Sequence, residues 1–145
     1  MVAAICCSEV SGVNGGIYIS TSSGITWTQS SALSKTSWIS VVVNTNGNYM
    51  YAISRTSGGY IGIIYTSSNH GSTWTTTSAP ATKTFSQLAI SSTGQYVGVI
   101  STQDGIFISS NYGSAWNLAI GTSSVVWTDI IVDSTGITFI LLSFH

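Results

Sequence analysis

The sequence predicts an all-β protein built from a repeated unit, and its composition is the first observation behind this prediction. Only 5% of the 145 residues are charged, whereas 43% are hydrophobic, and the mean hydropathy is +0.38. Disordered chains combine low hydrophobicity with high net charge, so this composition indicates a folded chain. Serine and threonine supply about a third of the residues, which suits turns and exposed strand faces.

The second observation is a motif that occurs three times. It has a serine, a small polar residue two positions later, a glycine two positions after that and a tryptophan three positions further on. The copies are residues 20–27, 67–74 and 109–116, with glycines at Gly24, Gly71 and Gly113 and tryptophans at Trp27, Trp74 and Trp116. Each copy lies between two runs of strand-forming residues, so we expect a turn there.

The third observation is a constant spacing. The motif glycines are separated by 47 and 42 residues. The same two intervals separate three aromatic residues that open apolar runs and three turn glycines: Trp38, Phe85 and Trp127, and Gly47, Gly94 and Gly136. Three markers that share both intervals indicate a true internal repeat. The difference between the intervals predicts a longer loop near residues 55–59.

One complete unit can be assigned from its residues. We expect strand A over 85–91, strand B over 95–101, strand C over 106–108 and strand D over 116–120. Four short strands in a unit of this length are typical of a β-propeller blade. The template places strands B, C and D over 1–10, 17–20 and 27–29, and a further A and B over 127–133 and 137–145. The prediction is one propeller segment over 1–145, with blades at about 1–34 (partial), 38–80, 85–121 and 127–145 (partial).

These units amount to about three and a quarter blades of four antiparallel strands, so we expect the ring to be incomplete in a monomer. Propellers typically have four to eight blades, and an open stack leaves strand edges bare. The ring is expected to close through a longer polypeptide or a homo-oligomer, or the copies to stack as a filament. The A strand that begins at Trp127 would then supply the missing innermost strand to the N-terminal unit of another copy.

The three motifs resemble the Asp-box, or BNR, repeat Ser-x-Asp-x-Gly-x-Thr-Trp of sialidase-like and sortilin-like propellers, and the resemblance covers nearly the whole chain. It implies that the motif is the turn between strands C and D, that its glycine has a positive φ and that its tryptophan packs between blades. The Asp position holds Ser22, Asn69 and Asn111, which can make the same local hydrogen bonds. In that family the boxes are structural and lie away from the active site.

The tryptophans are therefore expected in the core, with a platform that stacks on sugar rings as the alternative. Vicinal Cys6 and Cys7 are interpreted as small buried hydrophobes in a strand. His70 is expected to be a solvent-facing turn residue.

No catalytic residue, metal site or cofactor is predicted. A sialidase-like site needs an arginine cluster, and Arg55 is the only arginine. A glycosidase needs two facing carboxylates, and the four acids, Glu9, Asp104, Asp129 and Asp133, show no such pairing. A net charge of −1 and a pI of about 6.0 argue against a nucleic-acid partner. No apolar run is long enough to span a bilayer.

The charged residues give one candidate binding face. In a propeller the B–C and D–A loops share one side, and five of the seven charged residues map to these loops: Glu9, Lys35, Arg55, Lys83 and Asp104. We expect Lys35, Arg55, Lys83 and Asp104 to contact a ligand or partner; the alternative is that charges simply gather in loops. A polar column of Ser40, Gln87 and Asp129 in the A strands is expected to line the central channel.

The sequence therefore favours a non-enzymatic structural or binding module, in an extracellular, cell-surface or virion setting. Its expected partners are other copies or neighbouring blades. The alternatives are a carbohydrate-binding, lectin-like propeller and a fragment of a glycoside hydrolase whose catalytic acids lie outside this chain.

Overall fold

The computed structural model describes residues 1–6, 15–32, 37–55, 61–123 and 125–143, and within these ranges it contains strands and no helix. The strands are β1 (Val2–Cys6), β2 (Gly16–Ser20), β3 (Thr28–Gln29), β4 (Ser37–Val43), β5 (Met50–Arg55), β6 (Gly62–Ser67), β7 (Thr75–Thr76), β8 (Phe85–Ile90), β9 (Val97–Ser101), β10 (Gly105–Ser109), β11 (Asn117–Leu118), β12 (Trp127–Val132) and β13 (Phe139–Ser143).

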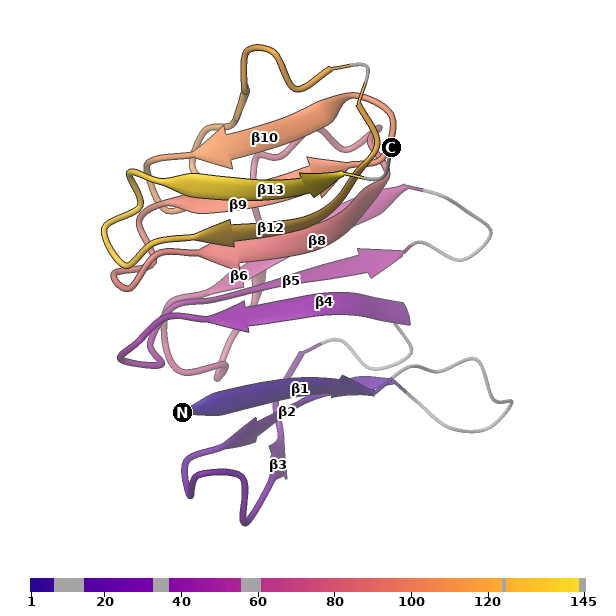
Figure 1. The fold of residues 1–145 in the computed structure, drawn as a ribbon. Helices are drawn as coiled ribbons and strands as arrows, with labels where there is room; N and C mark the ends of the chain where they lie inside the picture. The colour runs from indigo at the N-terminus through magenta and orange to yellow at the C-terminus, as the bar shows by residue number, and fades with distance from the viewer. Residues whose placement is uncertain (7–14, 33–36, 56–60, 124, 144–145) are drawn as a thin grey trace.

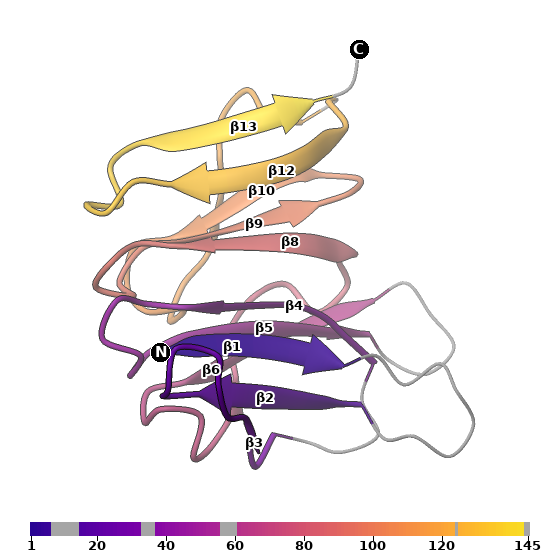
Figure 2. The ribbon, with the colours of Figure 1, turned by 60° about the horizontal axis from the view of Figure 1, so that its bottom comes forward.

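These strands form four antiparallel sheets, each made of neighbours in the chain. The sheet orders are β1-β2-β3, β4-β5-β6-β7, β8-β9-β10-β11 and β12-β13, and we call these sheets blades 1 to 4. Blades 2 and 3 have the predicted four strands, while among the described strands blade 1 has no A strand and blade 4 has no C or D strand. The blades stack in chain order from the N-terminal sheet to the C-terminal hairpin (Figures 1 and 2). The predicted all-β blade architecture is confirmed, and the ring is open.

Several strands are shorter than predicted. Each D strand has only two paired residues, for example Asn117–Leu118 where residues 116–120 were expected. Strand B of blade 1 is Val2–Cys6, and residues 7–10 of its predicted range, with Cys7 and Glu9, lie outside the described residues. Strand β13 ends at Ser143, short of the predicted residue 145.

The A strands repeat one irregularity. The register to strand B shifts between Trp38 and Ser40 in β4, and at the matching positions of β8 and β12. A bulge of this kind bends a strand and increases its twist. The repeat seen in the sequence is therefore also a repeat of backbone geometry.

The core lies between the blades rather than inside any one of them. Tyr51, Ile53 and Ile64 of blade 2 pack against a set from blade 3 that includes Phe85 and Val97. Similar clusters join blade 1 to blade 2 and blade 3 to blade 4. Blades 2 and 3 thus each have a forward face, covered by the blade that follows, and a back face that rests on the blade before. The matching forward face of blade 4 carries exposed residues.

The A–B turns also connect successive blades. The amide of Thr45 donates to the carbonyl of Ser92 at 3.2 Å, and the amide of Ser92 donates to the carbonyl of Ser134 at 3.1 Å. These residues occupy the same place in blades 2, 3 and 4. They therefore form a ladder of turns along the side of the stack that carries the A–B turns.

Candidate functional site

The three motif turns are closed by their own side chains. In blade 2, the buried Ser67 Oγ accepts the Gly71 amide at 3.0 Å. Asn69 Oδ1 accepts the Thr73 amide at 2.9 Å, and Trp74 Nε1 donates to the Gly71 carbonyl at 3.2 Å. The asparagine performs the capping that the resemblance implies for an aspartate.

The other two copies repeat this geometry. The serine-to-glycine contact is 2.9 Å in both, from the amides of Gly24 and Gly113. All three glycines have positive φ: 87° at Gly24 and 77° at Gly71 and Gly113. The residue before each glycine is also left-handed, with φ of 56° at Ser23, 58° at His70 and 57° at Tyr112. That second left-handed residue was not predicted, because neither serine, histidine nor tyrosine signals it.

The packing prediction for the tryptophans is wrong for one of them. Trp38 is 3% exposed, and Trp74, Trp116 and Trp127 are partly buried against the clusters between blades. Trp27 is 41% exposed. The motif tryptophan packs towards the preceding blade, as the bond from Trp74 Nε1 to Ser30 Oγ at 2.8 Å shows. Among the described residues, no blade lies in that position for Trp27.

On the predicted binding face, Lys83 and Asp104 come together. Lys83 Nζ lies 2.6 Å from Asp104 Oδ1, and Ser101 Oγ donates to Asp104 Oδ2 at 2.8 Å. Hydrogen bonds from Lys83 and Ser101 hold the pKa of the Asp104 carboxyl below its usual value, against a smaller desolvation effect. The pair links the residues before strand A to the B–C turn of the same blade. Because the two opposite charges are in contact, they neutralise each other.

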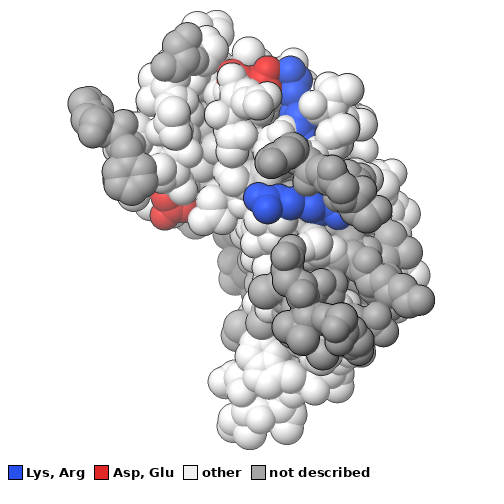
Figure 3. Space-filling view, turned by 90° about the vertical axis from the view of Figure 1, so that its right-hand side faces the viewer, with Lys and Arg blue, Asp and Glu red and all other residues white. Residues whose placement is uncertain are grey.

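Arg55 ends β5 on the same side and is exposed. Figure 3 shows the described basic side chains on this face, one of them beside an acidic group. Lys35 and Glu9 lie outside the described residues. The structure therefore brings together two of the four predicted contact residues, and their role in binding stays a prediction.

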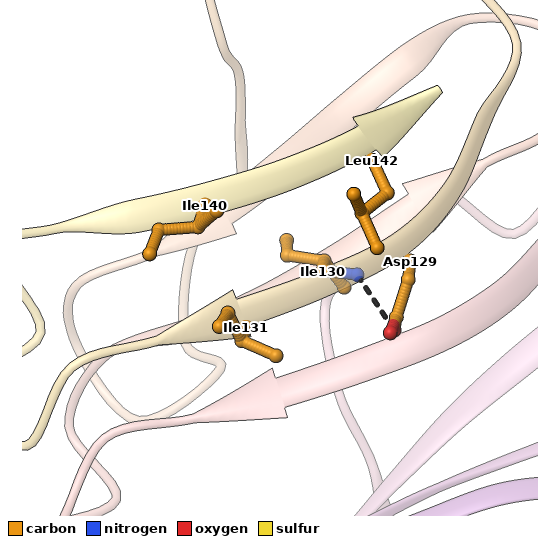
Figure 4. Close-up of a pocket in the computed structure, with 5 residues that line it drawn as sticks. All are labelled: Asp129, Ile130, Ile131, Ile140 and Leu142. Atoms are coloured by element: carbon orange, nitrogen blue, oxygen red, sulfur yellow. Dashed lines mark hydrogen bonds between the residues drawn. The ribbon is translucent and has the colours of Figure 1, made fainter. Parts of the chain in front are cut away.

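The polar column of the A strands does not form a uniform channel lining. Ser40 is buried, at 9% exposed, while Gln87 and Asp129 are half-buried. Asp129 Oδ1 accepts the amide of Ile130 at 2.9 Å. It lies at the edge of a hollow of about 260 Å³ on blade 4, lined otherwise by apolar side chains (Figure 4): Ile130, Ile131, Ile140 and Leu142.

An aromatic pair lies on the opposite side of the stack, which carries the motif turns. The rings of Tyr49 and Tyr112 are 4.7 Å apart with planes tilted by 32°, and Tyr112 is 41% exposed. Sequence reasoning missed this pair, because Tyr112 aligns with Ser23 and His70 and so breaks the repeat. His70 is exposed in its turn, as predicted.

Asp133 accepts the hydrogen bonds that close the A–B turn of blade 4. Desolvation raises the pKa of its carboxyl, but hydrogen bonds from Thr135 and from the amides of Thr138, Gly136 and Ile137 outweigh it and lower that pKa. Over the described ranges, no group of three His, Cys, Asp or Glu residues is arranged to hold a metal ion. The same part of the chain has no helix that could cross a membrane.

Comparison with solved structures supports the fold. The chain is similar to the GH74 enzyme of Niastella koreensis, with a TM-score of 0.66 and 17% identity, over 94% of this chain and 23% of the enzyme. An ancestral GH74 enzyme matches with 0.62 and 17%, over 92% and 20%. YCF48 in a structure with a bound D1 peptide matches with 0.61 and 14%, over 90% and 44%.

These neighbours are β-propeller proteins, and at such identities the likeness establishes the fold alone. The chain spans less than half the length of each of them. No protein-family model matches the chain, and no curated protein matches it. The class is therefore a β-propeller segment with an open ring.

Proposed function

We propose that this chain is a non-enzymatic structural or binding module that works within a larger propeller assembly. The observation that carries the proposal is the bare forward face of blade 4. Ile131, Ile140 and Leu142 on this face are 54%, 56% and 59% exposed. Burying large apolar side chains is worth about 1.5–3 kcal/mol each, so a partner blade would stabilise this end substantially.

The corresponding face of blade 3 supports this proposal. Matching Ile131, Ile140 and Leu142 through the repeat gives Ala89, Gly98 and Ile100, all of which are buried, Ala89 and Ile100 beneath blade 4. Particle images of the native protein provide the test. We expect closed rings or continuous stacks of blades. Isolated, open, monodisperse segments would contradict the proposal.

We further propose that the motif turns are degenerate Asp boxes with a structural role. A binding site is then expected on the opposite side of the stack, which carries the B–C and D–A loops. There Arg55 is the strongest candidate, because Lys83 is held by Asp104. Titration of a glutamate-rich peptide provides the test. Arg55→Ala is expected to weaken binding several-fold and Lys83→Ala to change it less, and equal binding by all three proteins would contradict this role.

The second candidate function is carbohydrate binding. The exposed Tyr112 ring beside Tyr49 favours it, since aromatic faces suit sugar rings. A glycan array separates the two functions: specific glycan signals that Tyr112→Ala removes would favour the lectin-like reading, and an array without signals would favour the structural one.

The third candidate is a fragment of a glycoside hydrolase, which the similarity to GH74 enzymes keeps in view. A native reading frame long enough to complete the ring, with two facing carboxylates in the added blades, would favour it. A native frame that adds no blades would contradict it.

A further inference from the structure

Blade 4 ends the ladder of A–B turns with a donor still available. Thr45 donates to Ser92, and Ser92 donates to Ser134. The next donor in this series is the Ser134 amide, for which the described residues offer no acceptor. At the other end of the ladder, the Thr45 carbonyl is the matching acceptor, and no described A–B turn donates to it.

A second repeated contact joins the end of each D strand to the motif turn of the next blade. Ser31 Oγ donates to the Ser72 carbonyl, and Ser78 Oγ donates to the Ser114 carbonyl at 2.8 Å. The repeat places Ile120 after strand D of blade 3, where Ser31 and Ser78 stand in the earlier blades, and Ile120 is fully exposed.

The motif turn of blade 1 shows the complementary change. Ile25 stands where Ser72 and Ser114 stand in the other turns, and it is 83% exposed. The junctions of blades 1 and 2 and of blades 2 and 3 therefore use serines at this contact, and the two unmatched positions of the series carry an isoleucine each. Ile120 of one copy and Ile25 of another would form an apolar contact if the two positions met.

We propose that the β12–β13 hairpin docks a second copy of this chain, whose β2 and β3 complete the sheet and whose β4 covers Ile131, Ile140 and Leu142. This inference rests on the proposed function and names the partner. In this arrangement Ile120 meets the partner's Ile25, and the Ser134 amide faces the partner's Thr45 carbonyl. One placement thus continues the ladder of turns and puts an isoleucine pair where the internal junctions have the serine contact.

Both β13 and the partner's β1 are B strands, and a blade has a single B strand. One of the two must therefore be displaced from the shared sheet. Strand β13 carries four large apolar residues in succession, whereas β1 has the sequence Val-Ala-Ala-Ile-Cys. Phe139 of β13 also packs into the space left by Gly98: a Cβ there would lie 2.8 Å from its ring. The partner's β1 is therefore the strand that leaves.

Stacking the partner's blade 1 as a separate fifth blade fits less well. At the internal junctions, residues of the following A strand, such as Phe85 and Leu88, form part of the buried cluster. Over the residues that the structure describes, blade 1 has no A strand. A partner blade 1 stacked in this way would therefore leave much of the apolar hollow on blade 4 uncovered.

Sedimentation velocity of the 145-residue chain over a range of concentrations provides the first test. We expect concentration-dependent association that Ile140→Lys abolishes. Ile61→Lys is the matched control, because Ile61 is also an exposed isoleucine (42%) but lies away from the hairpin face. Circular dichroism should show both variants folded. A wild-type monomer at all concentrations, or association that Ile140→Lys leaves intact, would overturn the proposal.

Cross-linking identifies the contact itself. With Cys6 and Cys7 replaced by serine, Ile25→Cys and Ile120→Cys are made as separate proteins, mixed and oxidised. We expect a mixed disulfide-linked dimer, and little product when Ser72→Cys replaces Ile25→Cys. Dimers of Ile120→Cys with itself would indicate a two-fold, face-to-face contact and would overturn the head-to-tail arrangement, as would the absence of mixed product.

These outcomes are separable from failure of the proposed function. A native protein that is longer and forms a closed monomeric ring would refute the second copy as partner while supporting the larger assembly. Particle images of isolated open segments would refute both.

Discussion

At the scale of single residues, the motif turns depend on a few buried hydrogen bonds. Each turn places two successive residues in the left-handed region, which costs energy for any residue except glycine. The serine at the first position offsets this cost by accepting the glycine amide in all three copies. The turn geometry is thus maintained by the hydrogen bonds of a serine that can be recognised in the sequence.

Replacing Ser67 with alanine is expected to destabilise the protein by about 1–3 kcal/mol, because the buried Gly71 amide loses its acceptor. Equilibrium urea denaturation measures the change. Ser68→Ala is the control, since Ser68 is exposed in the same turn. Equal effects of the two substitutions would contradict the role of the Ser67 hydroxyl.

Asn111→Asp tests the resemblance to the Asp box. Asn111 Oδ1 already accepts the Ala115 amide at 2.8 Å, and a charged acceptor makes a stronger bond. We expect a gain of about 0.5–1 kcal/mol at neutral pH. Because such bonds lower the pKa of a carboxylate, the gain should be present above about pH 4 and be lost as the pH falls further. Thermal unfolding at pH 7 and pH 3 measures it, and a gain that persists at pH 3 would argue against this cause.

At the scale of elements, stability depends on the junctions between blades. Tyr51 of β5 is fully buried, and its hydroxyl donates to the Gly94 carbonyl of the next blade at 3.2 Å. Burial raises the pKa of Tyr51 to about 12. One side chain thus contributes both packing and a polar bond to the junction of blades 2 and 3.

Tyr51→Phe should keep the packing and lose the bond, at a cost of about 1 kcal/mol. The unfolded tyrosine ionises near pH 10 and the folded one only near pH 12. The contribution of this tyrosine is therefore complete below pH 10 and is lost as the pH rises towards 12. Stability measured from pH 8 to 12 should fall more steeply for the wild type than for the variant. Tyr112→Phe, at an exposed ring, serves as the control, and identical pH profiles would refute the prediction.

At the scale of the whole molecule, the blades form a row in which each contacts only its neighbours. Repeat proteins of this kind gain stability from neighbour interfaces and lose it at their ends. Blades 2 and 3 have a neighbour on both sides, whereas blade 1 and blade 4 each have one within this chain.

Hydrogen exchange is expected to be faster in β12 and β13 than in β5 and β9, because local opening is easier where one face is bare. Mass spectrometry of peptic fragments at low protein concentration provides the measurement. Raising the concentration should protect β12 and β13 if copies associate there. Uniform protection at low concentration would contradict the picture of stacked blades with weak ends.

Much of this architecture was predictable, because it repeats. Glycines that need positive φ, strands of alternating character and the aromatic residue of each A strand recur at two intervals, so the sequence alone places the four blades and the open ring. The local chemistry of Ser20, Ser67 and Ser109 was predictable for the same reason: a turn is closed by residues that are neighbours in the chain.

What only the tertiary structure decides concerns residues that are distant in the chain. It pairs Lys83 with Asp104, stacks Tyr49 on Tyr112, leaves Trp27 exposed where no described blade covers it, and shows β12 paired with β13. Periodicity fixes which residues share a blade face, but whether that face is covered depends on what stands beside it. The sequence therefore determined the blade, and only the packed structure showed which of its faces were left bare.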